Sequence, residues 1–237
     1  MFPALGMPYI PTQNEEGETL PFDAIVGTFF LQYKVPEFLT TRRSREWHEL
    51  VPPGKYFRFA IYPESRSRQH NLMREVSRDR INVYYCTPGF SFWSDYSTYH
   101  SAKRIAEMSA FIPVDQLPAN HGSERHSVVY RISPLQFKWC SDEAIPLKPL
   151  WSAKAFIEKL KADKERHMTL EHAVQEVSRT LDRMLEFRPF PHHHHDKIPP
   201  VDARRNVSKR ERLLEDLGAR AFAEENLVLG FLPIRAD

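Results

Sequence analysis

The side chains best suited to chemistry in this chain of 237 residues are its eleven histidines and two cysteines. Four of the histidines form an unbroken run at residues 192–195, which prolines bound and Asp196 follows. In an extended loop alternate side chains point the same way, so His192 and His194 share one side. The run predicts at most adventitious binding of Zn²⁺ or Ni²⁺, because built metal sites draw their ligands from separate rigid elements. The alternative is a solvated polar loop, and we expect no resident cofactor.

The remaining histidines do not reproduce a zinc-ligand spacing on one helix face. His167 and His172 are five residues apart, which on a helix turns one imidazole about 140° away from the other. His100, His121 and His126 also have acidic residues near them in the sequence. An enzyme, such as a metal-dependent hydrolase with a histidine–acid site, is therefore kept as an alternative.

Sequence motifs for phosphate loops and activated nucleophiles are missing. None of the eight glycines forms G-x-G, and the chain has no G-K-S/T, so it carries neither a Rossmann fingerprint nor a P-loop. No D-x-K or E-x-K triplet occurs, which argues against nucleases that place an acid and a lysine on one strand. Residues 89–93 match only half of G-x-S-x-G, because Trp93 stands where the second glycine would permit a tight turn.

The strongest positive signal is a basic segment, residues 42–80, which holds nine arginines and Lys55 against five acids. Aromatic residues accompany this segment and continue to about residue 100. Arginine and aromatic residues are enriched in protein-interface hot spots, and they also supply phosphate contacts and stacking platforms for nucleic acids. The residues that we expect to form the contact surface are Arg42, Arg43, Arg66, Arg68, Arg74, Arg78, Arg80, Tyr84 and Trp93.

This pattern favours a non-enzymatic intracellular binding or regulatory protein that engages an acidic protein partner through residues 42–100. The first alternative is a nucleic-acid-binding protein that uses the same surface against single strands or the backbone. The second alternative is the enzyme described above. In a simpler interpretation the arginines pair with acids of their own segment and form no site.

Hydrophobic periodicity predicts an α+β protein: a β-rich N-terminal part, with a mixed or antiparallel sheet and short helices, followed by a helical C-terminal part. The expected strands are residues 22–35, 55–62, 80–87, 127–133 and 137–140. The expected helices are residues 36–50, 67–77, 98–110, 152–164, 169–187 and one that begins at Ser208. The corresponding domains are an extended leader (1–21), a β-rich α+β domain (22–148) and a helical region (149–237) that either stands apart or packs on the same core.

Composition sets the expected environment. The chain is 41% hydrophobic and 27% charged, as is usual for a soluble globular protein. The longest apolar run, residues 24–31, is far shorter than the roughly 20 residues that span a bilayer, so we expect no membrane insertion. Cys86 and Cys140 lie in apolar, strand-like segments and belong to no paired motif, which favours buried thiols in a reducing, cytoplasmic compartment.

Overall fold

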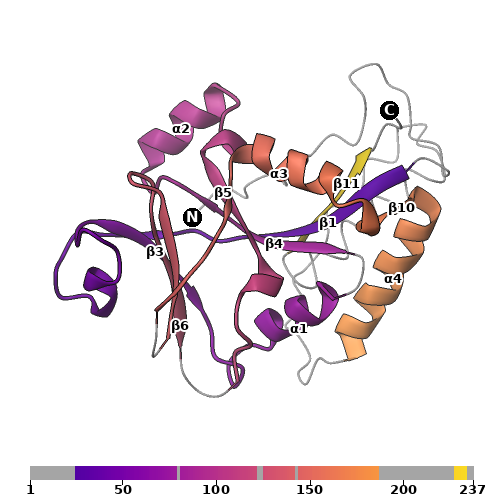
Figure 1. Ribbon diagram of the computed structural model, residues 1–237, viewed down its shortest axis with the longest axis horizontal. Helices are drawn as coiled ribbons and strands as arrows, with labels where there is room; N and C mark the ends of the chain where they lie inside the picture. Colours follow the sequence, from indigo (N-terminus) through magenta and orange to yellow (C-terminus); the bar gives the residue numbers. More distant parts are fainter. Residues whose placement is uncertain (1–24, 79–80, 122–124, 142–143, 187–226, 234–237) are drawn as a thin grey trace, which may run out of the picture.

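Two β-sheets stacked face to face enclose the main core of the protein (Figure 1). The computed structural model describes residues 25–78, 81–121, 125–141, 144–186 and 227–233. Its mixture of sheets and four helices confirms the α+β class. The predicted leader, the polyhistidine run and the helix expected from Ser208 lie outside the described residues.

The first sheet, called sheet A, is mixed. Its strands in spatial order are β10 (His167–Thr169), β1 (Ile25–Tyr33), β4 (Asn82–Pro88), β5 (Ser109–Pro113) and β9 (Leu150–Trp151), and β11 (Leu227–Pro233) also pairs with β1. Strands β1 and β4 run parallel, and the other pairs are antiparallel. Because Tyr33 lies opposite Cys86, the carboxyl ends of the two parallel strands lie side by side.

The second sheet, called sheet B, is antiparallel throughout. Its strands in order are β2 (Glu37–Leu39), β3 (Tyr56–Ile61), β6 (His126–Arg131), β7 (Gln136–Cys140) and β8 (Ala144–Pro146). Phe59 and Ile61 of β3 face the core between the sheets, while Tyr56 faces the opposite side. Side chains alternate across a strand, so one strand contributes to two apolar layers.

Helices and short 3₁₀ turns cover the sheets and their connections. The α-helices are α1 (Gln69–Val76), α2 (Trp93–Ser101), α3 (Ser152–Ala162) and α4 (Leu170–Glu186). The 3₁₀ turns are η1 (Arg45–His48), η2 (Ala106–Met108), η3 (Val114–Gln116) and η4 (Lys164–Arg166). No helix in the described part of the chain has both the length and the apolar character needed to cross a membrane.

Three apolar clusters show what each covering element does. Helices α1 and α4 add residues such as Met73 and Val177 to the same apolar core as the inner faces of the two sheets. Helix α3 covers the outer face of sheet A with Phe156 and Leu160. The turn η1 covers the outer face of sheet B with Trp47. Strand β4 is therefore buried on both faces, which explains its nearly continuous apolar sequence.

One tyrosine joins the two sheets directly. Tyr130 of β6 stacks between Phe57 and Phe137 on sheet B, at centroid distances of 5.3 and 4.7 Å. Its hydroxyl crosses to sheet A, where it donates a hydrogen bond to the Pro88 carbonyl (2.6 Å) and bonds the Thr87 hydroxyl (2.8 Å). The aromatic stack thus holds the carboxyl end of β4 against sheet B.

The predicted order of elements holds only in part. The short helices expected among the N-terminal strands are present as α1 and α2, but the C-terminal region contributes β9, β10 and β11 to sheet A as well as two helices. The helix predicted at 36–50 is wrong, because this stretch holds β2 and η1. The helix predicted at 98–110 is also wrong. Helix α2 ends at Ser101, shortly before Lys103 takes a positive φ of 55°, and residues 109–113 pair with β4 as a strand.

Replacing Tyr130 by phenylalanine tests the bridge between the sheets. The ring volume is preserved, but the buried Thr87 hydroxyl and the Pro88 carbonyl lose a hydrogen-bond partner. We expect Tyr130→Phe to lower the free energy of unfolding by about 1–3 kcal/mol in urea denaturation. The exposed Tyr62→Phe serves as the matched control and should change stability little. Equal stability of Tyr130→Phe and the wild type would show that the bridge contributes nothing.

Candidate functional site

The predicted arginine surface divides between two places. Arg42 and Arg43 are exposed in the loop that leads from β2 to η1, on the outer side of sheet B. Arg74 lies on α1 and Arg78 follows it, on the side of the molecule where α1 enters the core between the sheets (Figure 1). Sheet B thus separates Arg42 and Arg43 from Arg74 and Arg78. The basic segment therefore does not form one continuous surface.

Two further members of the predicted set make local contacts. The Arg66 guanidinium lies 4.3 Å from the ring centroid of Tyr62, and Arg68 forms an ion pair with Glu64 at 3.7 Å. Arg80 falls outside the described residues. The local-pairing interpretation therefore accounts for Arg68, whereas Arg42 and Arg43 form no ion pair with any described residue.

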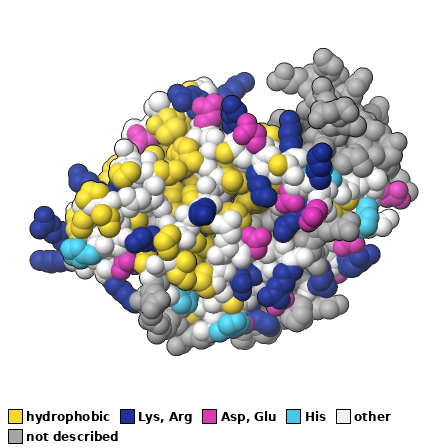
Figure 2. Space-filling model, viewed as in Figure 1, with side chains coloured by type: hydrophobic (Ala, Val, Ile, Leu, Met, Phe, Trp, Pro, Cys, Tyr) yellow, Lys and Arg dark blue, Asp and Glu magenta, His cyan; other side chains and the backbone are white. Residues whose placement is uncertain are grey.

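Aromatic side chains form a ladder along α2, made of Phe92, Trp93, Tyr96 and His100, in which Tyr96 is half-buried and the others are exposed. Trp93 is 71% exposed and Phe92 59% exposed. Trp93 stacks on Tyr96 at 5.0 Å, and Tyr96 stacks on His100 at 5.6 Å. No residue of α2 is buried in the described structure. Figure 2 shows hydrophobic side chains gathered over the part of this face where Figure 1 places α2, β3 and β6, with basic side chains at its rim.

Tyr84 does not belong to this surface. Its side chain is 2% exposed and contacts Phe156 edge-on at 5.1 Å, beneath helix α3. A ring buried in the core cannot stack on a partner. The misassignment has a simple cause: strand β4 is covered on both faces, so neither side of its alternation faces solvent.

The histidines of the enzyme alternative lie on different elements. His100 belongs to the ladder on α2, and His126 stacks on Trp139 at 5.1 Å. His121 approaches Glu64 at 3.6 Å. Within the described residues, no three histidine, cysteine, aspartate or glutamate side chains are grouped as metal ligands would be. His192 and His194 are outside those residues.

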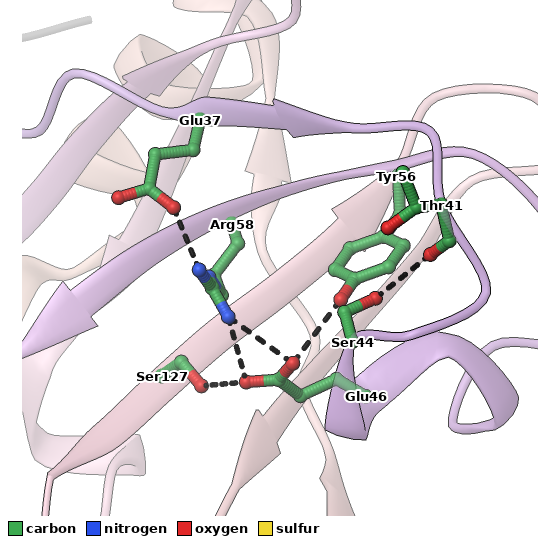
Figure 3. A network of polar contacts seen from close by, with 7 residues as sticks. All are labelled: Glu37, Thr41, Ser44, Glu46, Tyr56, Arg58 and Ser127. Carbon is green, nitrogen blue, oxygen red and sulfur yellow. Dashed lines mark hydrogen bonds and ion pairs between the residues drawn. The ribbon is translucent and has the colours of Figure 1, made fainter.

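A buried carboxylate network fixes η1 to the outer face of sheet B (Figure 3). Glu46, which is 8% exposed, accepts hydrogen bonds from the Ser127 hydroxyl (3.0 Å) and the Tyr56 hydroxyl (3.1 Å). The Arg58 guanidinium donates to Glu46 at 3.3 Å and to Glu37 at 2.7 Å. These partners of the Glu46 carboxylate come from β3 and β6, so the network is structural rather than a free site.

The same contacts set the ionisation of Glu46. Burial alone would raise the pKa of its carboxyl group. Hydrogen bonds from its own backbone N–H and from Ser127, together with the Arg58 charge, outweigh burial and hold the pKa below its ordinary value. The carboxylate is therefore the form that the fold stabilises.

A second polar group, not singled out by the sequence, lies between the sheets. We call it the basic cluster: Lys34, His70 and Arg74, with Gln32 and Tyr85. Gln32 lies directly opposite Tyr85 in the β1–β4 register, and the Lys34 ammonium lies 4.9 Å from the Tyr85 ring centroid. Tyr85 and His70 are hydrogen-bonded at 2.9 Å. His70 and Arg74 are one turn apart on α1 and share a face of that helix.

Burial controls the charge state of this cluster. It lowers the pKa of Lys34 to about 8. It also lowers the pKa of His70 to about 4, and the positive charges of Arg74 and Lys34 act in the same direction. Neutral His70 fits its contacts, since Nε2–H can donate to the Pro118 carbonyl (2.8 Å) while Nδ1 accepts from the Tyr85 hydroxyl.

A signal for the basic cluster was present in the sequence. Gln32 and Lys34 are two residues apart at the end of an apolar strand, so both point to the face that carries Phe30. Polar residues on a core-facing side require partners or a ligand. Comparisons with known proteins found no matching family model, curated protein or solved structure. The interpretation of the ladder and of the basic cluster therefore rests on their geometry.

Acid titration tests the Glu46 network. The folded-state pKa of Glu46 lies below its unfolded-state value, so its stabilisation is present above about pH 4.3 and is lost as the pH falls through the folded-state pKa. We expect Glu46→Gln to lower the unfolding free energy by about 1–3 kcal/mol at pH 7. The deficit should shrink towards pH 3 in urea titrations.

The exposed Glu158→Gln is the control for this titration, and its stability should follow the wild type across the range. A deficit of Glu46→Gln that is equal at pH 7 and pH 3 would contradict the assigned role of the carboxylate charge.

Proposed function

We propose that this protein is a non-enzymatic binding or regulatory protein that engages an acidic protein partner. The contact surface consists of the aromatic ladder on α2 with the loop that carries Arg42 and Arg43. The exposure of the ladder is the observation that carries the proposal. Because both cysteines are buried and unpaired, we also propose a reducing compartment such as the cytoplasm.

The ladder has the properties of an interface anchor. Large aromatic side chains bury much apolar area at little cost in side-chain entropy, and tryptophan and tyrosine dominate interface hot spots. Trp93 and Phe92 expose such area without covering the core, while Tyr99, on α2, contacts Phe90 at 5.0 Å. A helix that exposes its apolar rings gains stability when a partner covers them.

The arginine loop supports an acidic partner. Phe38 of β2 contacts Phe92 at 5.9 Å, which ties the strand before this loop to the start of the ladder. Arg42 and Arg43 are exposed and form no ion pair with any described residue, so their charges remain available to carboxylates. Charges at the rim of an interface mainly increase the association rate and make it sensitive to salt.

Peptide selection tests the proposal and does not require that the partner be identified first. A displayed library of random peptides would be selected on the wild-type protein and counter-selected on a Phe92→Ala/Trp93→Ala variant. We expect the enriched peptides to be acidic and to bind the double variant at least tenfold more weakly, since hot-spot anchors contribute about 2 kcal/mol or more. Arg42→Ala/Arg43→Ala should weaken binding at low salt and reduce its salt dependence.

Ile157→Ala, which trims an exposed apolar residue on α3, should leave peptide binding unchanged. The same proteins would be titrated with labelled single- and double-stranded DNA and RNA. If the selection enriches no acidic peptides and the protein binds nucleic acid tightly in a way that requires Trp93, the nucleic-acid alternative replaces this proposal.

A further inference from the structure

A serine lies among the arginines of the loop between β2 and η1. Ser44 directly follows Arg42 and Arg43 and precedes Arg45. Arg42 and Arg43 are exposed and form no ion pair with any described residue. The Arg45 guanidinium donates a hydrogen bond to the Ser141 carbonyl at 2.7 Å. Three guanidinium groups therefore flank this hydroxyl in the sequence, and no acid lies within the loop to offset them.

The Ser44 side chain lies at the surface of the loop. It is half-buried, and its backbone is extended, with φ −74° and ψ 138°. The hydroxyl donates to the Thr41 carbonyl in the same loop at 3.1 Å (Figure 3). It also lies beside the Tyr56 hydroxyl, where it partly offsets the rise that burial causes in the pKa of Tyr56. Freeing this hydroxyl therefore requires a change in the loop and not in either sheet.

The acid nearest to Ser44 in the sequence is already paired. Glu46 is 8% exposed, and Arg58 and two hydroxyls bind its carboxylate. Its charge is therefore held inside the network, and residues 40–45 present only arginine charge. Protein kinases select their substrates partly by such charge patterns around the acceptor hydroxyl. The loop thus has the charge that an arginine-selecting serine kinase recognises.

We propose that Ser44 is a phosphorylation site whose modification weakens binding of the acidic partner, an inference that rests on the proposed function. The reaction takes its phosphoryl group from ATP and requires a serine kinase that selects arginine. The Oγ of Ser44 attacks the γ-phosphorus, so a P–O bond forms while the bond from this phosphorus to the β–γ bridging oxygen breaks. ADP leaves, and the hydroxyl proton passes to the catalytic carboxylate of the kinase.

Phosphorylation changes the charge that the loop presents to an acidic partner. A phosphoserine carries a charge of about −1.5 to −2 at pH 7, which offsets the two positive charges of Arg42 and Arg43. These guanidinium groups can then pair with phosphate oxygens in place of the carboxylates of the partner. The aromatic ladder lies on another element, α2, and receives no charge. The modification therefore removes the electrostatic part of the surface and leaves the apolar part.

Ser67 is the matched comparison, because it also lies between two arginines and is also half-buried. Local partners already engage those arginines: one guanidinium lies 4.3 Å from the ring centroid of Tyr62, and the other pairs with Glu64 at 3.7 Å. A kinase that reads arginine charge should therefore prefer Ser44.

Treatment of the full chain with magnesium, ATP and a purified arginine-selecting serine kinase tests the site without any partner. Mass spectrometry would locate each phosphate. We expect Ser44 to be phosphorylated about tenfold faster than Ser67, and about tenfold more slowly in Arg42→Ala/Arg43→Ala than in the wild type. Both arginines are exposed, so this variant should keep the wild-type unfolding temperature. Phosphorylation of Ser44 that does not exceed that of Ser67, or that does not need the two arginines, would overturn the proposal.

The acidic peptides selected on the wild type then test the effect on binding. The phosphorylated protein should bind such a peptide roughly tenfold more weakly at low salt, and the difference should shrink as the salt concentration rises. Kinase-treated Ser44→Ala should bind it as the untreated variant does. Unchanged affinity after complete phosphorylation of Ser44 would overturn the regulatory role. If the selection yields no acidic peptide, the proposed function fails and the regulatory role fails with it, whereas the kinase assay decides the phosphorylation site by itself.

Discussion

The contact between Tyr130 and the end of β4 links the two sheets directly, at the place from which both α2 and the end of β1 are reached. The Tyr130 hydroxyl bonds Thr87 and Pro88 across the space between the sheets, and the stack with Phe57 and Phe137 holds the ring in place. Helix α2 follows the end of β4, and β1 ends beside the same strand. The start of the ladder and the end of β1 therefore both lie close to this interaction between the sheets, although they face different surroundings.

The two sites illustrate opposite departures from an ordinary fold. On α2, aromatic rings that normally build a core are left at the surface, where only a partner can cover them. In the basic cluster, the Gln32 amide lies on the core side of β1, where its Oε1 has no hydrogen-bond donor among the described residues. The Glu46 network shows the contrasting case, because its buried charge is matched by Arg58 and two hydroxyls.

The elements whose type follows from their own sequence were predicted correctly. The alternation in β3, the period of α4 and the apolar run of β4 all led to the correct element type. Strand β5 was missed because its pairing with β4, not its own sequence, makes it a strand. The arginines were grouped by their sequence proximity, but sheet B separates Arg42 from Arg74. Lys34 was overlooked because a polar residue at a strand end looks ordinary until the facing sheet is known.

The ionisation of Lys34 offers the most direct measurement of the claim that the space beside Tyr85 disfavours positive charge. A titration that follows the lysine ¹³Cε resonances by NMR, assigned with Lys34→Met, would give the pKa of this amine. The account predicts a pKa of about 8, because burial disfavours the charged ammonium. A pKa near the ordinary 10.5 would contradict it.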